Sequence, residues 1–379
     1  MSNRITNDRF IPLRTTDNND LSKYLLKHDI GDDPYSKNLF QRFFSLEKQP
    51  PILNFTPLKK FTPITITTTI QHKRQFPHSP QSLDAPELSQ DVLCHPLASC
   101  KKTLAVVLAK TIYSYDLDQR TIDQLITEQE APFCIDLMSN GTLLNYGTEN
   151  GVLKHYSIED QIEIASFTLP ELATVLCHDE KSMYAGRYDG KILFWDLRTD
   201  SQKTIQTFTN CEVYNIELQN KLMATSFGNG MIKVWDIRKT EKPVALFNQF
   251  NTAVRALSWH PSGTLFAGGG SHIKILDVNS NKILSSIDSG TAVTNIHTNR
   301  DELISCHGDG KCKLWKINNK TLEFQSASDD MGSPINYSSL ADEDTTLITA
   351  MDETIKIWRN MFITPPPEKK SEPFEFQIR

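Results

Sequence analysis

The stretches DGKILFWDLR (residues 189–198) and NGMIKVWDIR (residues 229–238) share one pattern, and this pattern decides the fold of the 379-residue chain. Each stretch begins with Asp-Gly or Asn-Gly, pairs that are typical of the two-residue turn of a β-hairpin. Apolar and polar residues then alternate up to a Trp-Asp pair, as expected for a strand with one buried face. Both stretches therefore predict a tight turn that leads into a half-buried strand.

The same pattern recurs along most of the chain. Clear copies are GDGKCKLWKI and DETIKIWRN, and weaker copies are AKTIYSYDLD, NGVLKHYSIE and SHIKILDVNS. The aromatic residue or its equivalent stands at positions 115, 156, 195, 235, 276, 315 and 358. A period near 40 residues with Trp-Asp endings is the signature of the WD40 repeat, in which each repeat forms a four-stranded blade. We expect an all-β, seven-bladed WD40 β-propeller, because an irregular β-sandwich would not keep this period.

The repeats also show one departure from the usual pattern and one landmark. The Gly-His pairs that usually precede such repeats are missing, so we expect only part of their usual network of structural hydrogen bonds. Trp259, in RALSWHPSG, marks an inner strand and the turn that follows it.

The position of the repeats divides the chain into three parts. We expect the propeller at residues 83–360, a mostly disordered regulatory arm at residues 1–82 and a short C-terminal tail at residues 361–379. The arm is rich in Asn, Asp, Thr and Pro, a composition that buries too little apolar surface to fold alone. Within it, NNDLSKYLLKHDIG and DPYSKNLFQRFFSLEK have helical apolar spacing and predict short helices that pack on the propeller or dock on a partner.

The charge distribution argues against nucleic acid as the main partner. The net charge is −6, but residues 1–80 contain twelve Lys and Arg against seven Asp and Glu, so the rest of the chain is strongly acidic. A protein body that binds DNA would itself be basic. No apolar run approaches the roughly 18 residues of a membrane span, so we expect no membrane association.

The cysteines indicate a reducing compartment. They number seven, an odd count, and no two of them form a CxxC pair. This pattern favours reduced thiols and a location in the nucleus and cytoplasm. Cys94-His95 and Cys177-His178 could each supply two metal ligands, but no second pair stands at zinc-ligand spacing, so we expect no metal.

No catalytic motif is evident. The chain has no P-loop, no G-x-S-x-G and no H-E-x-x-H, and its acidic residues are typical of solvated turns between strands. Propellers mostly recognise peptides on their faces. We therefore expect a binding protein that is not an enzyme and needs no cofactor.

Three kinds of short motif lie in the two terminal parts. DRFIPLR, at residues 8–14, frames an apolar core with arginines, and the chain ends on Ile378-Arg379. Pro12 favours an extended Ile11, so Phe10 and Ile11 can enter apolar pockets while Arg9 and Arg14 reach carboxylates. Proline follows Thr56, Thr62 and Ser79, which is the pattern that proline-directed kinases phosphorylate, although a proline-rich linker would contain such pairs as well.

Together these features resemble the fizzy and fizzy-related activators of the anaphase-promoting complex, a ubiquitin ligase. The resemblance covers nearly the whole chain and includes DRFIPLR, QSLDAPELSQD, TAVRALSWHPSGTLFAGGG and the terminal Ile-Arg. It implies that a C-box docks on helical-repeat subunits of the ligase together with Ile378 and Arg379. The C-box residues are Asp8, Arg9, Phe10, Ile11, Pro12 and Arg14. Separately, Lys59 follows Thr56 and its proline at the place where cyclin-dependent kinases prefer a basic residue, so the sequence predicts such a kinase as a regulator; only Thr56 fits this full pattern.

The resemblance further implies that the propeller binds substrates such as cyclins through their destruction boxes. Asp91 and Glu353 correspond to the carboxylates that pair with the destruction-box Arg between the first and last blades. Asn229 stands in the shortened top-face turn for a second, Lys-Glu-Asn motif, and Ser333 and Pro334 replace the arginine expected in that pocket. From the residues alone, Asp91 and Glu353 are equally typical of acids at blade-edge turns.

A different class of function also fits a propeller with polar ends. In this alternative the chain is a general WD40 scaffold unrelated to ubiquitin, residues 1–14 are dispensable, and the terminal Ile-Arg is accidental. Affinity purification with and without residues 8–14 would separate the two hypotheses.

Overall fold

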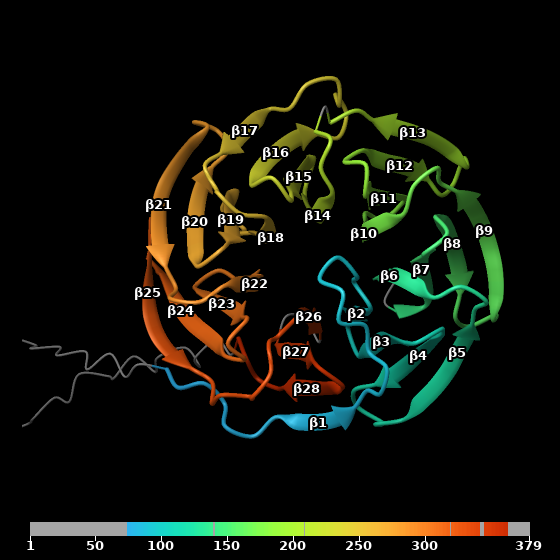
Figure 1. Cartoon of the computed structure of the whole chain (residues 1–379), viewed down its shortest axis with the longest axis horizontal. Helices are drawn as coiled ribbons and strands as arrows, with labels where there is room; N and C mark the ends of the chain where they lie inside the picture. The colour runs from blue at the N-terminus through green and yellow to red at the C-terminus, as the bar shows by residue number, and fades with distance from the viewer. Residues whose placement is uncertain (1–73, 139–140, 208, 319, 342–344, 363–379) are drawn as a thin grey trace, which may run out of the picture. The chain divides into compact units, whose positions relative to one another are not determined.

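Seven four-stranded antiparallel sheets form a ring in the computed structural model, which describes residues 74–138, 141–207, 209–318, 320–341 and 345–362 (Figure 1). This arrangement confirms the seven-bladed propeller expected from the repeat. The described residues contain no helix that is long and apolar enough to cross a membrane.

The blades follow one another along the chain, each starting with its innermost strand. Blade 1 consists of β2 (Leu97–Cys100), β3 (Thr103–Leu108), β4 (Thr111–Asp116) and β5 (Ile122–Thr127). Blade 2 consists of β6 (Pro132–Met138), β7 (Leu143–Thr148), β8 (Val152–Ser157) and β9 (Ile162–Thr168). Blade 3 consists of β10 (Ala173–His178), β11 (Ser182–Arg187), β12 (Ile192–Asp196) and β13 (Ser201–Ile205). Blade 4 consists of β14 (Val213–Gln219), β15 (Leu222–Phe227), β16 (Met231–Asp236) and β17 (Ala245–Asn248).

The remaining three blades follow the same plan. Blade 5 consists of β18 (Val254–Trp259), β19 (Thr264–Gly269), β20 (His272–Asp277) and β21 (Lys282–Asp288). Blade 6 consists of β22 (Val293–Thr298), β23 (Glu302–His307), β24 (Cys312–Asn318) and β25 (Thr321–Ala327). Blade 7 consists of β26 (Tyr337–Ala341), β27 (Thr346–Met351), β28 (Thr354–Trp358) and β1 (Gln81–Asp84).

The repeat marks all fall in the third strand of their blades, and Trp259 ends the innermost strand of blade 5. Three of the marked tryptophans donate their indole N–H to a hydroxyl of the adjacent strand, at 2.8–3.1 Å. Trp195 instead donates to Asp200, at 2.8 Å. In blade 3 the marked tryptophan is therefore hydrogen-bonded to the turn between β12 and β13.

The turn glycines of the two opening stretches meet a steric requirement. Gly230 has a φ of +84°, and a Cβ there would lie 2.2 Å from the backbone oxygen of Phe250. Gly190 has a φ of +81°, and its Cβ would lie 2.1 Å from the oxygen of Thr209. Only glycine combines this backbone conformation with so close an approach of the neighbouring loop.

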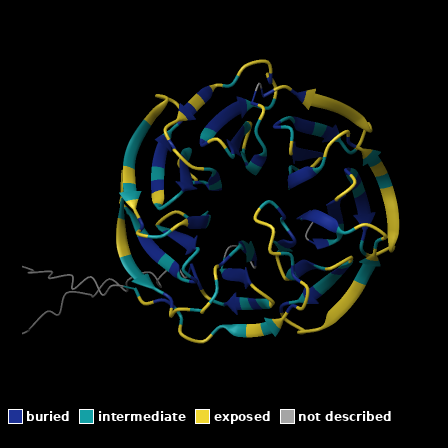
Figure 2. Cartoon of the chain, viewed as in Figure 1, coloured by how far each residue is buried: buried dark blue, intermediate teal, exposed yellow. Residues whose placement is uncertain are grey.

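The core lies between neighbouring blades, because each sheet packs one face on the blade before it and the other face on the blade after it. One cluster, for example, joins Ile232 and Val234 of blade 4 to Leu265 and Leu276 of blade 5. Figure 2 shows the consequence, with buried inner strands and a largely exposed rim of outer strands. Burial of these apolar contacts is the main source of stability in such a ring.

The ring closes through the strand that comes first in the sequence. β1 pairs antiparallel with β28, with Gln81 opposite Ile357, so the beginning and end of the propeller share blade 7. The expected boundary between residues 82 and 83 falls within this strand. Closure pairs the sheet edge that blade 7 would otherwise expose.

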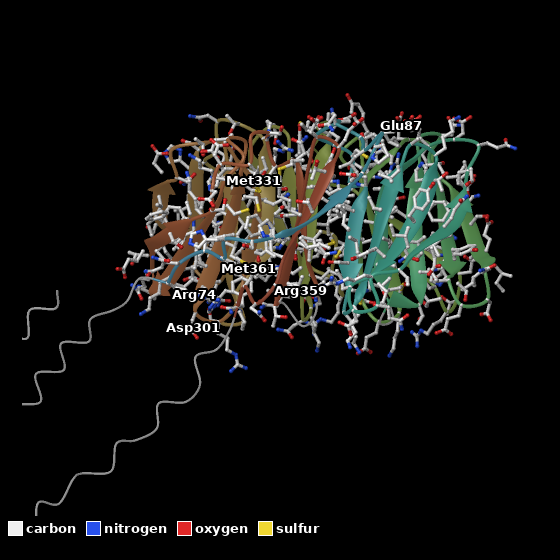
Figure 3. All side chains as sticks on the ribbon, turned by 90° about the horizontal axis from the view of Figure 1, so that it is seen from below. Arg74, Glu87, Asp301, Met331, Arg359 and Met361 are labelled. Carbon is white, nitrogen blue, oxygen red and sulfur yellow. The ribbon has the colours of Figure 1, made fainter. Side chains whose placement is uncertain are left out.

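Residues just before β1 also pack on the ring. Phe76 is 2% exposed, and its ring centroid lies 5.1 Å from that of Trp358. The Arg74 guanidinium donates to the backbone oxygen of Met361 and forms an ion pair with Glu302. Figure 3 shows Arg74 and Met361 near the lower face of the propeller.

Candidate functional site

The link from β1 to β2, residues 85–96, runs across the seam between blades 7 and 1. Its start is fixed by Ala85, whose N–H donates to the backbone oxygen of Glu353 at 2.8 Å, and by the buried side chain of Leu88. Its end is fixed by His95, which forms a parallel bridge with Cys134 of β6. The part between them projects toward the centre of the ring (Figure 1).

Asp91 lies in this seam segment with an exposed side chain. Its Oδ1 accepts the N–H of Leu93 at 3.0 Å, which folds the segment into a local turn. Its backbone oxygen accepts the N–H of Cys94 at 3.0 Å and the hydroxyl of Tyr337. The turn is thus held by the backbone oxygen of Asp91 and by Oδ1, while the side chain as a whole stays exposed.

Glu353 lies in the turn between β27 and β28, also with an exposed side chain. Its Oε1 accepts the N–H of Glu87, at 3.4 Å. Gln90 connects this turn to the turn of Asp91, because its side-chain amide donates to the backbone oxygen of Asp352 at 2.9 Å. The structure therefore brings together the segments of the two predicted clamp residues, which are more than 250 positions apart in the sequence.

The seam is acidic. Five acidic residues lie in β1, in the segment that follows it and in the β27–β28 turn, and all five are exposed: Asp84, Glu87, Asp91, Asp352 and Glu353. None of them forms an ion pair with a Lys, Arg or His among residues 74–138, 141–207, 209–318, 320–341 and 345–362. The seam can therefore attract a cationic group and accept hydrogen bonds from it.

The other predicted residues lie elsewhere. Asn229 is in the β15–β16 turn of blade 4, where its Oδ1 accepts the N–H of Met231 at 3.1 Å, so it is not part of the seam. Ser79 is exposed between Phe76 and β1. The C-box residues 8–14, Thr56, Thr62 and the terminal Ile378-Arg379 lie outside the described residues.

Sequence reasoning missed two residues that hold the seam together. Tyr337 lies in no motif, and Gln90 lies in QSLDAPELSQD but had no predicted role. Each gains its role only because blades 1 and 7 are neighbours in the ring. The Tyr337 hydroxyl donates to the backbone oxygens of Ser89, at 3.1 Å, and Asp91. One feature of the sequence could have indicated Tyr337. It starts the inner strand of the last blade, and in a closed propeller the last blade lies beside the first.

The two Cys-His pairs have structural partners. His178 lies 2.6 Å from Asp136 of the neighbouring blade, whose charge and hydrogen bond raise the histidine's pKa although burial lowers it. Cys94 donates to the oxygen of Phe133, and burial raises the pKa of its thiol to about 12. Within the described part of the chain, no three His, Cys, Asp or Glu side chains are arranged to hold a metal ion.

Comparison with known proteins finds one matching family model and several curated relatives. The family described as "Anaphase-promoting complex subunit 4 WD40 domain" matches residues 233–301. Meiotic fizzy-related protein 1 of Schizosaccharomyces pombe is 26% identical, over 79% of this chain and 74% of that protein. APC/C activator protein CDH1 of Saccharomyces cerevisiae is 26% identical, over 77% of this chain and 53% of that protein.

A plant relative and a solved structure extend the likeness. Cell division cycle 20.4, cofactor of APC complex, from Arabidopsis thaliana is 24% identical, over 96% of this chain and 90% of that protein. A chain in the crystal structure of the mitotic checkpoint complex matches with a TM-score of 0.71 and 24% identity. That match covers 75% of this chain and 96% of the other, and it shows the shared propeller fold.

Proposed function

We propose that this chain, a homologue of the fizzy-related and Cdc20-type activators of the anaphase-promoting complex, recruits substrates to that ubiquitin ligase. The names of its relatives and the WD40 match support the role. In this proposal the chain makes and breaks no covalent bond. It raises the effective concentration of a bound substrate near the ligase, which is how a linked pair of weak sites promotes reaction.

The observation that carries the proposal is the acidic seam between blades 7 and 1. Asp91 and Glu353 present solvent-exposed carboxylates from two turns that Gln90 connects. A guanidinium is planar and has several N–H donors, so it can bind carboxylates on two sides at once. We infer that this pair binds the arginine of a destruction box, as in cyclins.

Ligase docking is assigned to the terminal parts of the chain. The C-box at residues 8–14 and the terminal Ile378-Arg379 offer apolar side chains flanked by guanidinium groups, which suit pockets on helical-repeat subunits. Two residues near the ends of the described part of the chain lie away from the acidic seam. Figure 3 shows Arg74 and Met361 near the face opposite to Glu87, which belongs to the acidic seam.

Regulation by cyclin-dependent kinase is part of the same proposal. Thr56, Thr62 and Ser79 precede proline, and Ser79 is exposed beside β1. A phosphate would add about two negative charges to a basic arm and weaken its attraction to an acidic partner. Such regulation, together with substrates that act in cell division, fits an activator in the nucleus and cytoplasm.

Affinity purification of the full chain tests ligase docking. The tagged chain, a variant lacking residues 8–14 and a variant lacking Ile378-Arg379 are compared by quantitative mass spectrometry. We expect ligase subunits with the full chain and at least a tenfold loss in each variant, while the thermal unfolding of the propeller stays unchanged. Equal recovery of ligase subunits in all three samples would refute docking through these residues. Absence of ligase subunits from all three would favour the general scaffold.

A further inference from the structure

A small pocket lies where the inner strands of several blades converge on the channel. It has a volume of about 30 Å³, and its lining includes His95, Tyr214, Arg255, Thr294 and Tyr337. This volume holds roughly two water molecules or one small polar group. The chemistry of the lining therefore determines which group can enter.

Arg255 is the only Lys or Arg that lines this pocket. Its side chain is half-buried and forms no ion pair or hydrogen bond with any residue in the described part of the chain. The phenols of Tyr214 and Tyr337 line the pocket beside it, and burial lowers the pKa of its guanidinium. A half-buried guanidinium without a carboxylate partner has five N–H donors available for a ligand.

Thr294 gives an independent indication of a ligand. It lines the same pocket and is 3% exposed, and its Oγ1 has no hydrogen-bond partner among the described residues. Buried hydroxyls are nearly always hydrogen-bonded, because a hydroxyl that loses its water contacts without gaining another partner destabilises the fold. Arg255 and Thr294 therefore bring to one pocket, from two neighbouring blades, two side chains without a hydrogen-bond partner among the described residues.

The other polar side chains that line the pocket are neutral. His95 Nδ1 lies 2.9 Å from the backbone oxygen of Thr174, and burial is the main cause that lowers the pKa of this imidazole. The Tyr337 hydroxyl donates to the backbone oxygen of Asp91, so it is not an anion. The pocket thus combines one fixed positive charge with neutral polar groups.

We propose that this pocket binds the carboxylate of an acidic side chain, Asp or Glu, in a peptide that lies across the propeller face. Planar carboxylates match the guanidinium of Arg255 in two parallel hydrogen bonds, and the Thr294 hydroxyl donates a third. No covalent step is involved.

The pocket adjoins the acidic seam but has the opposite charge. Tyr337 lines the pocket and also holds the turn of Asp91, and Asn336 lines it while donating to Gln90 at 3.0 Å. A peptide whose basic residue occupies the seam could therefore place an acidic residue in the pocket. The identity of this occupant rests on the proposed function, whereas the carboxylate chemistry of the pocket does not.

Capped single amino acids test the carboxylate site directly. The full chain is titrated with N-acetyl-glutamate methylamide and with the neutral N-acetyl-glutamine methylamide at equal ionic strength, and dissociation constants are measured by ligand-observed NMR. We expect the glutamate derivative to bind at least tenfold more tightly, because only it carries the charge. Equal affinities for the two compounds would overturn the proposal.

Three variants assign the effect to the pocket. Arg255→Gln should abolish the preference for glutamate, whereas Arg255→Lys should retain part of it. Arg238→Gln is the matched control, since Arg238 is an exposed arginine already paired with Asp236. Retention of the full preference in Arg255→Gln, or its loss in Arg238→Gln, would contradict the assignment.

Thr294→Val separates binding from stability. Valine has nearly the same shape but lacks the unpartnered hydroxyl, so the melting temperature should stay equal or rise while glutamate binds several-fold more weakly. Unchanged glutamate affinity would remove Thr294 from the site. These measurements need no ligase, so selective glutamate binding by a chain that recovers no ligase subunits would uphold the pocket and refute the proposed function.

Discussion

The side-chain amide of Gln90 donates a hydrogen bond to the backbone oxygen of Asp352 at 2.9 Å, and this contact crosses the closure of the ring. The same side chain accepts a hydrogen bond from Asn336 through its Oε1, at 3.0 Å. One glutamine thus connects the segment before blade 1 to two parts of blade 7. The relative position of the two proposed clamp residues depends on this connection.

Gln90→Ala should loosen the seam without unfolding the propeller. Loss of these side-chain hydrogen bonds at an exposed site should cost about 1 kcal/mol of unfolding free energy. Binding of a destruction-box peptide should weaken several-fold, because Asp91 and Glu353 lose a shared anchor. Denaturant unfolding and fluorescence anisotropy measure the two effects. Gln119→Ala is the control, since Gln119 is exposed and bonds through its backbone N–H; an equal loss of binding there would contradict this role.

The double variant Asp91→Asn with Glu353→Gln should remove the proposed clamp. Both substitutions keep the side-chain shape and the oxygens that accept from Leu93 and Glu87, but both remove a negative charge. Charge-assisted hydrogen bonds contribute roughly 1.5–3 kcal/mol each, so affinity for an arginine-containing destruction-box peptide should fall by about tenfold or more. Isothermal titration calorimetry provides the dissociation constants.

The matched control for the clamp is Asp277→Asn, in blade 5. Asp277 also accepts backbone N–H groups of its own turn, with Asn279 at 3.0 Å, but it lies far from the seam in the ring. Its substitution should leave peptide affinity unchanged. An unchanged affinity in the double clamp variant would exclude these two carboxylates as the binding site.

Phe76→Ala should destabilise the propeller although residue 76 precedes its first strand. The phenyl ring of Phe76 is fully buried beside Trp358. Removal of such a side chain typically lowers the free energy of unfolding by about 3–5 kcal/mol. Differential scanning calorimetry should therefore show a clear drop in melting temperature. Gln75→Ala, at an exposed neighbouring position, should have almost no effect. Similar melting temperatures for the two variants would show that the segment does not contribute to the fold.

Glu217 should make the propeller less stable as the pH rises. Burial, with a smaller contribution from the charge of Asp136, raises the pKa of this carboxyl to about 8 in the folded chain, against about 4.3 when unfolded. The folded state therefore holds the proton more tightly. This contribution to stability is complete below about pH 4 and is lost as the pH rises through 8.

Glu217→Gln removes this titration and isolates it from other groups. The variant should become progressively more stable than the unmodified chain between about pH 4 and pH 8, as measured by urea unfolding at a series of pH values. A pH-independent difference for Glu217→Gln would show that this carboxyl is ionised equally in both states.

The sequence by itself determined the repeat and therefore the blades. Gly190 and Gly230 were recognisable because Asp-Gly and Asn-Gly turns are local, and the marked residues reappear in the third strand of each blade. Local alternation of apolar residues is visible in any short window, since neighbouring side chains point to opposite faces of a strand. The pairing of Asp91 with Glu353 came from a family resemblance, and their roles in binding stay predictions.

Only the tertiary structure decided what the closed ring brings together. Phe76 belongs by composition to a polar arm, but closure places Trp358 beside it. Gln90 has only the nearby Leu88 as a local partner, and closure adds Asp352, which is 262 positions away. Arg255 and Thr294 likewise become one pocket only where separate blades converge. These contacts have no period and no motif, because they arise between strands that are distant in sequence and meet only when the last blade takes up the first strand.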